Sequence, residues 1–132
     1  MSTLNVDTLS PVTPGGPVNI TGAPPTFLGT TSGFGYAQIK PISGTSYTID
    51  PTDVGKVLRT TSASPVTIIA NSGLPTWGII GIRQAGAGTV SVTAGSGVTI
   101  TSPASLNSSG PNSSLALHIV SSTVYDLTGD LA

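Results

Sequence analysis

The residues best able to do chemistry in this chain are one histidine and five aspartates. His118 lies in the alternating segment 115–120, eight residues before Asp126. A Ser-His-Asp triad needs a serine on a sharp strand-to-helix turn, and no G-x-S-x-G segment supplies one. Alternation places His118 on one strand face with Ala116 and Val120, opposite the large aliphatic residues. This pattern favours a subunit-contact or ordinary strand residue over a catalytic base.

The remaining polar candidates fit turns better than active sites. Asp53 and Lys56 could form an acid–base pair, but Pro51-Thr52-Asp53-Val54-Gly55 has the composition of a turn, so we expect Asp53 to cap the backbone ahead of Gly55. The aspartates lack the spacing of a calcium loop, which leaves an ion at a subunit contact as the open metal hypothesis. We expect no catalytic residue, no cofactor site and no metal site within the chain.

Two further segments have a structural and a binding interpretation. Gly86-Ala87-Gly88 lacks the third glycine and the following helix of a dinucleotide fingerprint, so it is interpreted as a turn. Trp77 opens the most apolar segment, which favours a core position over a platform for stacking a sugar. Asn-x-Ser/Thr triplets are expected by chance in a chain with 18 Ser and 20 Thr.

Composition excludes several classes of protein. The chain has 132 residues, 7% of them charged, and a net charge of −1. Its four basic residues are scattered, whereas nucleic-acid binding needs them clustered. There is no cysteine and therefore no disulfide framework. No signal peptide or apolar run long enough to span a bilayer is visible. Abundant Thr, Ser, Val, Ile, Gly and Pro exclude an all-α fold.

Short strands separated by turns recur from about residue 37 onward, and no helix of ten residues is indicated. We expect strands at 46–50, 56–60, 66–70, 78–84, 89–94, 98–101, 115–120 and 123–127. The segments 89–94 and 98–101 flank Gly95-Ser96-Gly97 and are predicted to form a hairpin. The last two segments are predicted to pair with each other. The expected fold is all-β, a small antiparallel β-sandwich or barrel at 37–132.

Residues 1–36 are predicted to form an extended, Pro/Gly-rich N-terminal arm. Five prolines lie between positions 11 and 25, and they exclude a continuous central strand. Apolar residues nevertheless recur within the segment, as expected for an arm that lies on another surface rather than for a solvated linker. An N-terminal strand and loops folded onto the same chain is the alternative. The predicted anchors of the arm are Leu4, Val6, Leu9, Val18 and Ile20.

The expected domain has a thin core, because the whole chain has only six aromatic residues. Small β domains of this kind gain stability by oligomerising. Strand edges of Thr, Ser and Val with few charges are also poorly protected against pairing. Both features predict a homo-oligomer.

Several segments, in order, resemble a module of tailed-bacteriophage fibre and other virion proteins. A strand, a D-x-G-K turn and a second strand span residues 47–60. Residues 81–92 are similar to the module's I-x-Q-x-G-x-G-x-V-x-V segment, and residues 95–100 to its G-x-G-V-T-I segment. The ending 124–131 resembles W-x-L-x-G-D-L, with Tyr125 at or next to the tryptophan. Residues 2–9 and 18–22 are similar to the opening of virion-attached proteins.

The resemblance implies a structural protein of a phage virion. The leading expectation is a capsid decoration, or cement, protein that binds the major capsid protein on the outer head surface as a homotrimer. It would be assembled in the bacterial cytoplasm and would contact neither nucleic acid nor membrane. A tail-fibre or adsorption module is the alternative. The chain ends just after one module, without heptads or a repeat array, which favours decoration.

Overall fold

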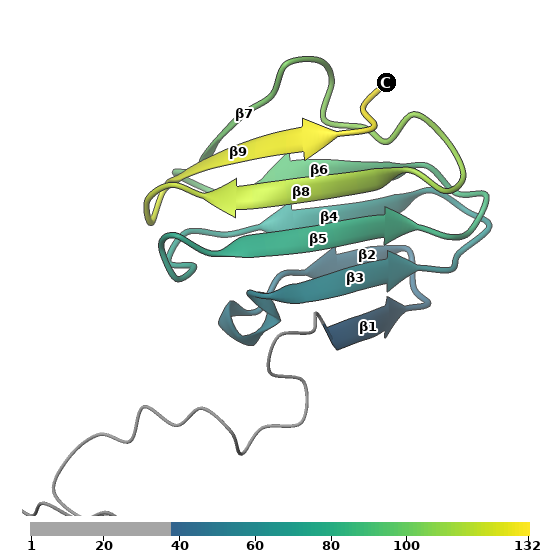
Figure 1. The fold of residues 1–132 in the computed structure, drawn as a ribbon, viewed down its shortest axis with the longest axis horizontal. Helices are drawn as coiled ribbons and strands as arrows, with labels where there is room; N and C mark the ends of the chain where they lie inside the picture. The colour runs from purple at the N-terminus through teal and green to yellow at the C-terminus, as the bar shows by residue number, and fades with distance from the viewer. Residues whose placement is uncertain (1–37) are drawn as a thin grey trace, which may run out of the picture. The chain divides into compact units, whose positions relative to one another are not determined.

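The computed structural model describes residues 38–132, which form nine strands and one 3-10 turn (Figure 1). The expectation of an all-β fold is therefore confirmed for this part of the chain. The elements are β1 (Gln38–Ile42), β2 (Ser46–Thr48), η1 (Pro51–Asp53), β3 (Lys56–Thr60), β4 (Val66–Ala70), β5 (Ile79–Gln84), β6 (Val90–Ala94), β7 (Thr99–Thr101), β8 (Ser114–Ile119) and β9 (Val124–Gly129).

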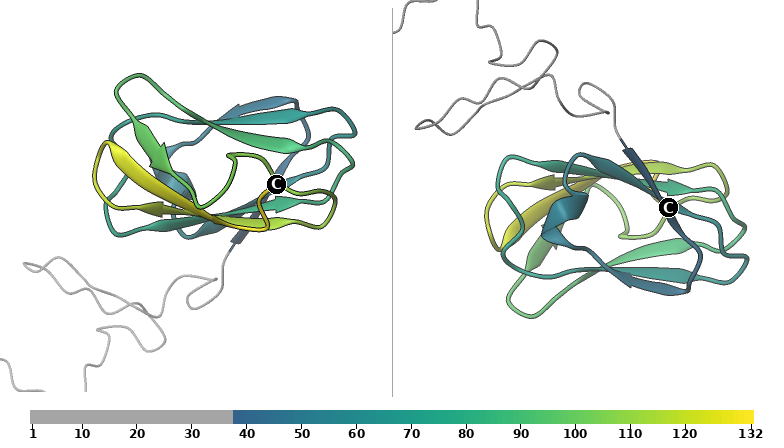
Figure 2. Two further views of the ribbon diagram at one scale, coloured as in Figure 1. Left: turned by 90° about the horizontal axis from the view of Figure 1, so that it is seen from above. Right: turned by 90° about the horizontal axis from the view of Figure 1, so that it is seen from below.

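The strands form two sheets that face each other across the core (Figure 2). The larger sheet has the order β1-β3-β5-β8-β9-β7, and the smaller has the order β2-β4-β6. Alternation along each strand directs every second side chain inward, as the pleat requires. The largest fully buried side chains are Tyr125, Leu58, Ile68, Ile80, Ile82, Leu117, Ile119, Leu127, Gln84, Val66, Val90 and Val92.

Successive turns of the chain stack as a coil. Each of the first three turns contributes one strand to each sheet: β1 and β2, then β3 and β4, then β5 and β6. Neighbouring turns therefore pair in parallel, and five of the seven pairings are parallel. Only β8 returns antiparallel, between β5 and β9. The architecture is solenoid-like, and the predicted antiparallel arrangement is wrong.

The predicted hairpin around Gly95-Ser96-Gly97 is also wrong. β6 belongs to the smaller sheet, whereas β7 pairs in parallel with β9 at the edge of the larger one. A short glycine turn can join two paired strands or carry the chain from one sheet to the other, and the local sequence is the same in both cases. The predicted pairing of the last two strands is confirmed, because β8 and β9 are antiparallel neighbours.

Close stacking of the turns explains two of the glycines. The Gly86-Ala87-Gly88 turn lies directly against the equivalent turn of the preceding coil. A Cβ at Gly86 would be 2.1 Å from the carbonyl oxygen of Ser62, and one at Gly88 would be 1.9 Å from that of Ser64. Gly88 N–H also donates to Ser62 O at 3.0 Å. The interpretation as a turn is thus confirmed, and these glycines allow two backbones to touch.

Buried polar groups hold the long 102–113 loop to the body. The Gln84 side chain is buried; its amide donates to Gly86 O at 3.1 Å and accepts from the Ser108 hydroxyl. The same hydroxyl accepts from Val90 N at 2.8 Å. Within residues 38–132 no buried side-chain polar atom lacks a partner. A fully bonded network of this kind fixes a unique core arrangement.

Replacing Gly88 by alanine should destabilise the fold, because the added methyl group meets the backbone of the preceding turn and not a flexible side chain. We expect a loss of about 1–3 kcal/mol in the free energy of unfolding, measured by urea denaturation. Gly44→Ala is the matched control, since its Cβ would have only Ser46 O nearby, at 3.8 Å. Equal stability of the two variants would contradict the close stacking.

Candidate functional site

The surface around Trp77 is the most distinctive part of the described body. Its side chain is 87% exposed, so the expectation of a core position is wrong. The reason is local: Trp77 lies in the turn before β5 and has a positive φ of 66°, so it does not continue the strand. Ile79 and Val120, two of the other exposed large hydrophobic residues, lie next to it on the fold. Trp77 is the most exposed of the large hydrophobic side chains in the described part of the chain.

Backbone hydrogen bonds hold the loop 73–78 in place. At its start, Gly73 N–H donates to Ser122 O at 2.9 Å. At its end, Trp77 N–H donates to Ile119 O at 2.8 Å. Both acceptors lie at the junction between β8 and β9, so the loop is attached to the larger sheet at two points.

Packing fixes the loop from inside as well. Leu74 is buried and anchors it in the core. Gly78 lies so close to Val54 that a Cβ would come within 2.3 Å of the Val54 Cγ1 atom. A left-handed backbone is uncommon for tryptophan, and such strained residues concentrate at functional sites. The backbone of the loop is therefore held in place at the point where Trp77 leaves it.

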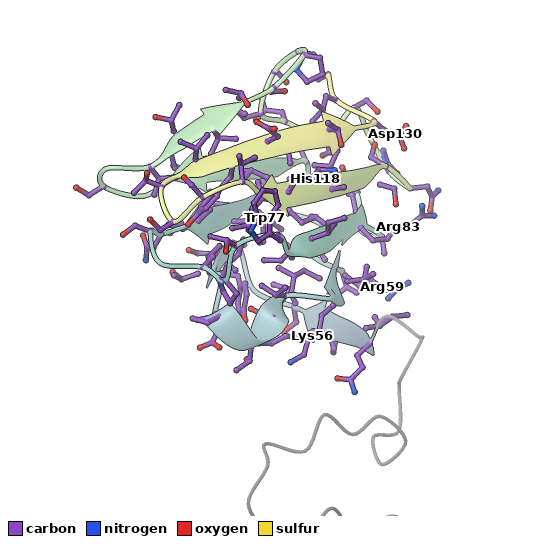
Figure 3. All side chains as sticks on the ribbon, turned by 60° about the vertical axis from the view of Figure 1, so that its left-hand side comes forward. Lys56, Arg59, Trp77, Arg83, His118 and Asp130 are labelled. Carbon is purple, nitrogen blue, oxygen red and sulfur yellow. The ribbon has the colours of Figure 1, made fainter. Side chains whose placement is uncertain are left out.

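A row of polar side chains crosses the outer face of the larger sheet beside Trp77. In the strand register, Ile79 is opposite His118, His118 is opposite Asp126, and Asp126 is opposite Thr101. The predicted face of His118 is confirmed, since Leu115, Leu117 and Ile119 are buried. Figure 3 shows Trp77 and His118 on the same side of the body.

His118 contacts one polar side chain in the described part of the chain. Its Nε2 atom lies 3.4 Å from the Thr128 hydroxyl. Within residues 38–132, no serine forms a hydrogen bond with His118. Of the residues that a Ser-His-Asp triad needs, the fold therefore places only Asp126 opposite His118, across the β8–β9 pair. The arrangement can bind a ligand through hydrogen bonds, but it assembles no nucleophile and base.

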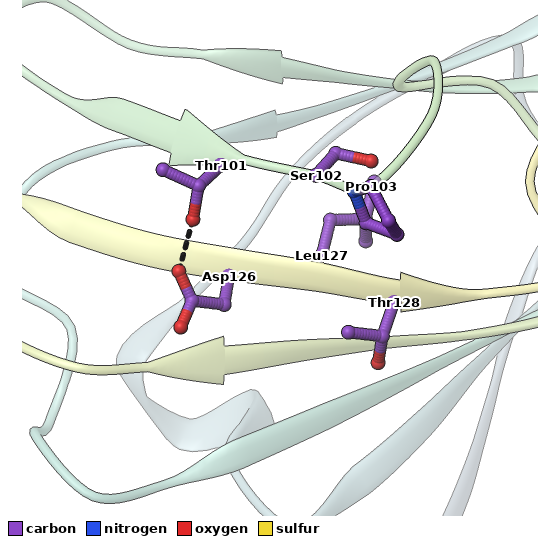
Figure 4. A pocket seen from close by; sticks show the side chains of 6 residues that line it. All are labelled: Thr101, Ser102, Pro103, Asp126, Leu127 and Thr128. Carbon is purple, nitrogen blue, oxygen red and sulfur yellow. Dashed lines mark hydrogen bonds between the residues drawn. The ribbon is translucent and has the colours of Figure 1, made fainter.

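An open depression continues the row at its far end (Figure 4). Its volume is about 270 Å³, and it lies between the end of β7 and the middle of β9. Thr101 donates a hydrogen bond to the Asp126 carboxylate, and both residues line the depression. The lining residues are Thr101, Ser102, Pro103, Asp126, Leu127 and Thr128. The hydroxyl groups and the carboxylate of this lining can form hydrogen bonds with a polar ligand.

A second polar cluster closes the first turn of the coil. The Asp53 carboxylate is fully buried; it accepts from Lys40 Nζ at 2.9 Å, from the Tyr47 hydroxyl at 2.6 Å and from Asp50 N at 2.9 Å. Lys40 also donates to Tyr47. The turn interpretation of Asp53 is confirmed, with a capping box at η1. Its lysine partner is Lys40, not Lys56, because β1 lies beside β3 at this end.

The cluster favours its ionised form. Burial opposes the charge on Asp53, but the hydrogen bonds from Tyr47, Lys40 and the Asp50 backbone outweigh it and lower the pKa of Asp53. Hydrogen bonds to Tyr47 and Asp53 raise the pKa of Lys40. Burial, followed by the bond to Asp53, raises the pKa of Tyr47. Its hydrogen bonds join β1, β2 and η1, so the cluster has a structural role. We call these three residues, Lys40, Tyr47 and Asp53, the latch.

The other predicted features have mixed outcomes. The predicted arm anchors Leu4, Val6, Leu9, Val18 and Ile20 lie outside the described residues and stay predictions. Within residues 38–132, no three metal-ligating side chains gather. No helix in that range is long and apolar enough to cross a membrane.

Comparison with known proteins finds no family model, no curated protein and no solved structure that matches this chain.

Replacing Asp53 by asparagine should destabilise the body at neutral pH by about 1–3 kcal/mol, because Lys40 and Tyr47 lose a charged acceptor. Since the folded pKa of Asp53 lies below its unfolded value of about 3.9, its contribution is present above that value. It is lost as the pH falls through the folded pKa. Unfolding curves measured between neutral and acidic pH should show this loss in the native chain and not in D53N.

Asp130→Asn is the matched control for this experiment. The Asp130 carboxylate is exposed and accepts one backbone N–H, from Ser114 at 3.0 Å, which an asparagine oxygen can still accept. This variant should keep both the stability and the acid profile of the native chain. An identical profile for D53N would show that the latch contributes nothing to the pH dependence.

Proposed function

We propose that this chain is a structural protein of a tailed-phage virion. It binds the outer surface of the head as a homotrimer, contacts the major capsid protein and stabilises the shell. The arm at 1–36 ties neighbouring capsid subunits together, with the β body as a rigid spacer. A ligand that binds only the assembled shell stabilises it by mass action. Three linked arms raise the effective concentration of each contact.

The segments that resemble virion proteins support the proposal by their place in the fold. Residues 47–60 span β2, η1 and β3, and residues 81–92 span most of β5 and the start of β6. Residues 124–131 include all of β9. The resemblance therefore falls mainly on strands of one compact unit, Gly35–Ala132, although β4 and β8 lie outside the resembling segments. A module that occurs in several virion proteins must fold as one compact unit, and the position of these segments is consistent with that.

The open end of the coil is the observation on which the proposal chiefly depends. At one end of the smaller sheet, residues 106–108 cover β6, with Ser108 N–H bonded to Val90 O at 2.8 Å. At the other end, no described strand pairs with the outer edges of β1 and β2. Exposed strand edges invite pairing with another chain. They suit a protein whose partner, a second copy or the shell, completes the sheet.

Deleting residues 1–36 should leave a folded β body but remove most binding to the particle. Each apolar anchor that is buried on the shell contributes roughly 1.5–3 kcal/mol, so loss of several anchors abolishes tight binding. The measurement is occupancy of purified particles after adding the full chain or the truncated chain. Circular dichroism of the truncated chain serves as the folding control. Full occupancy by the truncated chain would place attachment in the β body instead.

The same particles test shell stabilisation. Heads carrying the full chain should release DNA at a higher temperature than bare heads, because contacts that bridge subunits must break together before the shell opens. Heads mixed with the truncated chain should behave as bare heads. Unchanged DNA release at full occupancy would contradict a cement role.

The exposed Trp77 favours a second candidate, a tail-fibre or adsorption module. A fixed aromatic ring on the surface is a typical contact for a receptor. In that case loss of the protein would abolish host adsorption and leave the heat release of DNA unchanged. The two candidates are thus separated by adsorption and heat-release measurements on particles with and without the chain.

A further inference from the structure

We propose that the outer face of the larger sheet carries a binding site for a neutral oligosaccharide, extending from Trp77 across His118 to the depression at Asp126. This site is independent of the arm and serves the chain in either virion position. The apolar face of one sugar ring stacks on the indole, and its neighbours bond to the polar row.

The first element of the site is the aromatic platform. Trp77 is exposed, yet its loop is attached to the β8–β9 junction by two backbone hydrogen bonds and to the core by Leu74. A rigid aromatic side chain loses little conformational entropy when a ligand stacks on it. Ile79 and Val120 are also exposed, and both are near Trp77 along the backbone, since Trp77 N–H is bonded to Ile119 O. The platform is therefore pre-organised for the C–H face of a pyranose.

The second element is the row of hydrogen-bonding groups. His118, Asp126 and Thr101 follow one another on β8, β9 and β7, and Thr128 lies beside them on β9. From β5 to β7 the row crosses three inter-strand steps of about 4.8 Å each. A short oligosaccharide has this extent, and its hydroxyl groups both donate and accept. The imidazole, carboxylate and threonine hydroxyl groups supply both kinds of partner.

Charge selects a neutral sugar. Asp126 is the charged side chain within the row, and it would repel a sugar acid. Lys56 lies at the same end of the larger sheet, at the start of β3, but on a strand that is not part of the row. The outer face also carries Arg59 and Arg83, which are register partners on β3 and β5. They lie at the opposite end of these two strands (Figure 3). They are therefore placed away from the row. The row itself holds an imidazole, a carboxylate and threonine hydroxyl groups, whereas the centre of a protein–protein contact is depleted of charged groups. The exposed apolar residues Ile39, Ile79 and Val120 lie outside the row's polar part. The mixture favours a glycan over a protein partner.

Trp77 is the only tryptophan of the chain, so its fluorescence reports on this site alone. The full chain is titrated with lactose, cellobiose and chitobiose, and with N-acetylneuraminic acid as the anionic comparison. We expect a saturable emission change with at least one neutral sugar and none with the acid. In amide NMR spectra, the shifts should be confined to Trp77, His118, Asp126, Thr128 and the 101–103 segment.

Variants separate the platform from the polar row. Trp77→Ala should weaken binding at least tenfold, and Trp77→Phe should retain part of it. Asp126→Ala should weaken binding several-fold. Thr93→Ala, exposed on the opposite sheet, should bind as the native chain does. Because Trp77 makes no core contact, W77A should unfold within about 0.5 kcal/mol of the native chain, so loss of binding cannot be attributed to misfolding.

Two results would overturn the proposal. One is the absence of any emission or NMR change with all the neutral sugars at millimolar concentration. The other is an emission shift that follows protein concentration or added bare heads and not sugar, which would identify the Trp77 face as a protein contact. Neither result would touch the head-binding proposal, which is tested separately through the arm.

Discussion

The rest of this structure depends on one constraint, the parallel stacking of successive chain turns. Each strand in the first three turns lies on its equivalent from the turn before, with register maintained in both sheets. Stacked turns bring backbones into contact, which requires glycine at Gly86 and Gly88. Stacking also leaves edges where the coil begins, and there the Lys40–Tyr47–Asp53 latch ties the first turn together. The fold of this chain, which has few charges and few aromatic residues, is thereby stabilised by backbone pairing and by a continuous, largely aliphatic core.

The same constraint positions the candidate sites. Turns pass from one sheet to the other at the ends of the strands, and residues there are free of the regular stacking. The loop 73–78 is such a place: it leaves β4, is held at the β8–β9 junction, and places Trp77 on the surface. Antiparallel β8 then ends the parallel series, and β8 and β9 present His118 and Asp126 side by side. The groups of the proposed oligosaccharide site thus lie where the regular stacking stops.

Local sequence predicted the strands well and their partners poorly. The expected strands at 56–60 and 66–70 coincide with β3 and β4, because alternation and β-branched residues are local properties. β1 was missed, since Pro41 lies within it. Parallel pairing was missed because it joins distant residues. A signal for this pairing is present in the sequence: Val66 pairs with Val90 and Ala70 with Ala94, and both pairs have the same separation along the chain.

The position of Trp77 could not be predicted, because hydropathy does not encode its positive φ. Lys40 could not be matched to Asp53 either, because only the stacking of the turns brings them together.

The central functional claim is that this body, with its arm, is a regular component of the phage head. The most direct test of this proposal is the copy number of the chain in purified virions, measured by quantitative mass spectrometry against the major capsid protein. The account predicts many copies, in a simple ratio to the capsid subunits that fits trimers at defined surface sites. A handful of copies per particle, as for a tail or fibre component, or none at all, would contradict it.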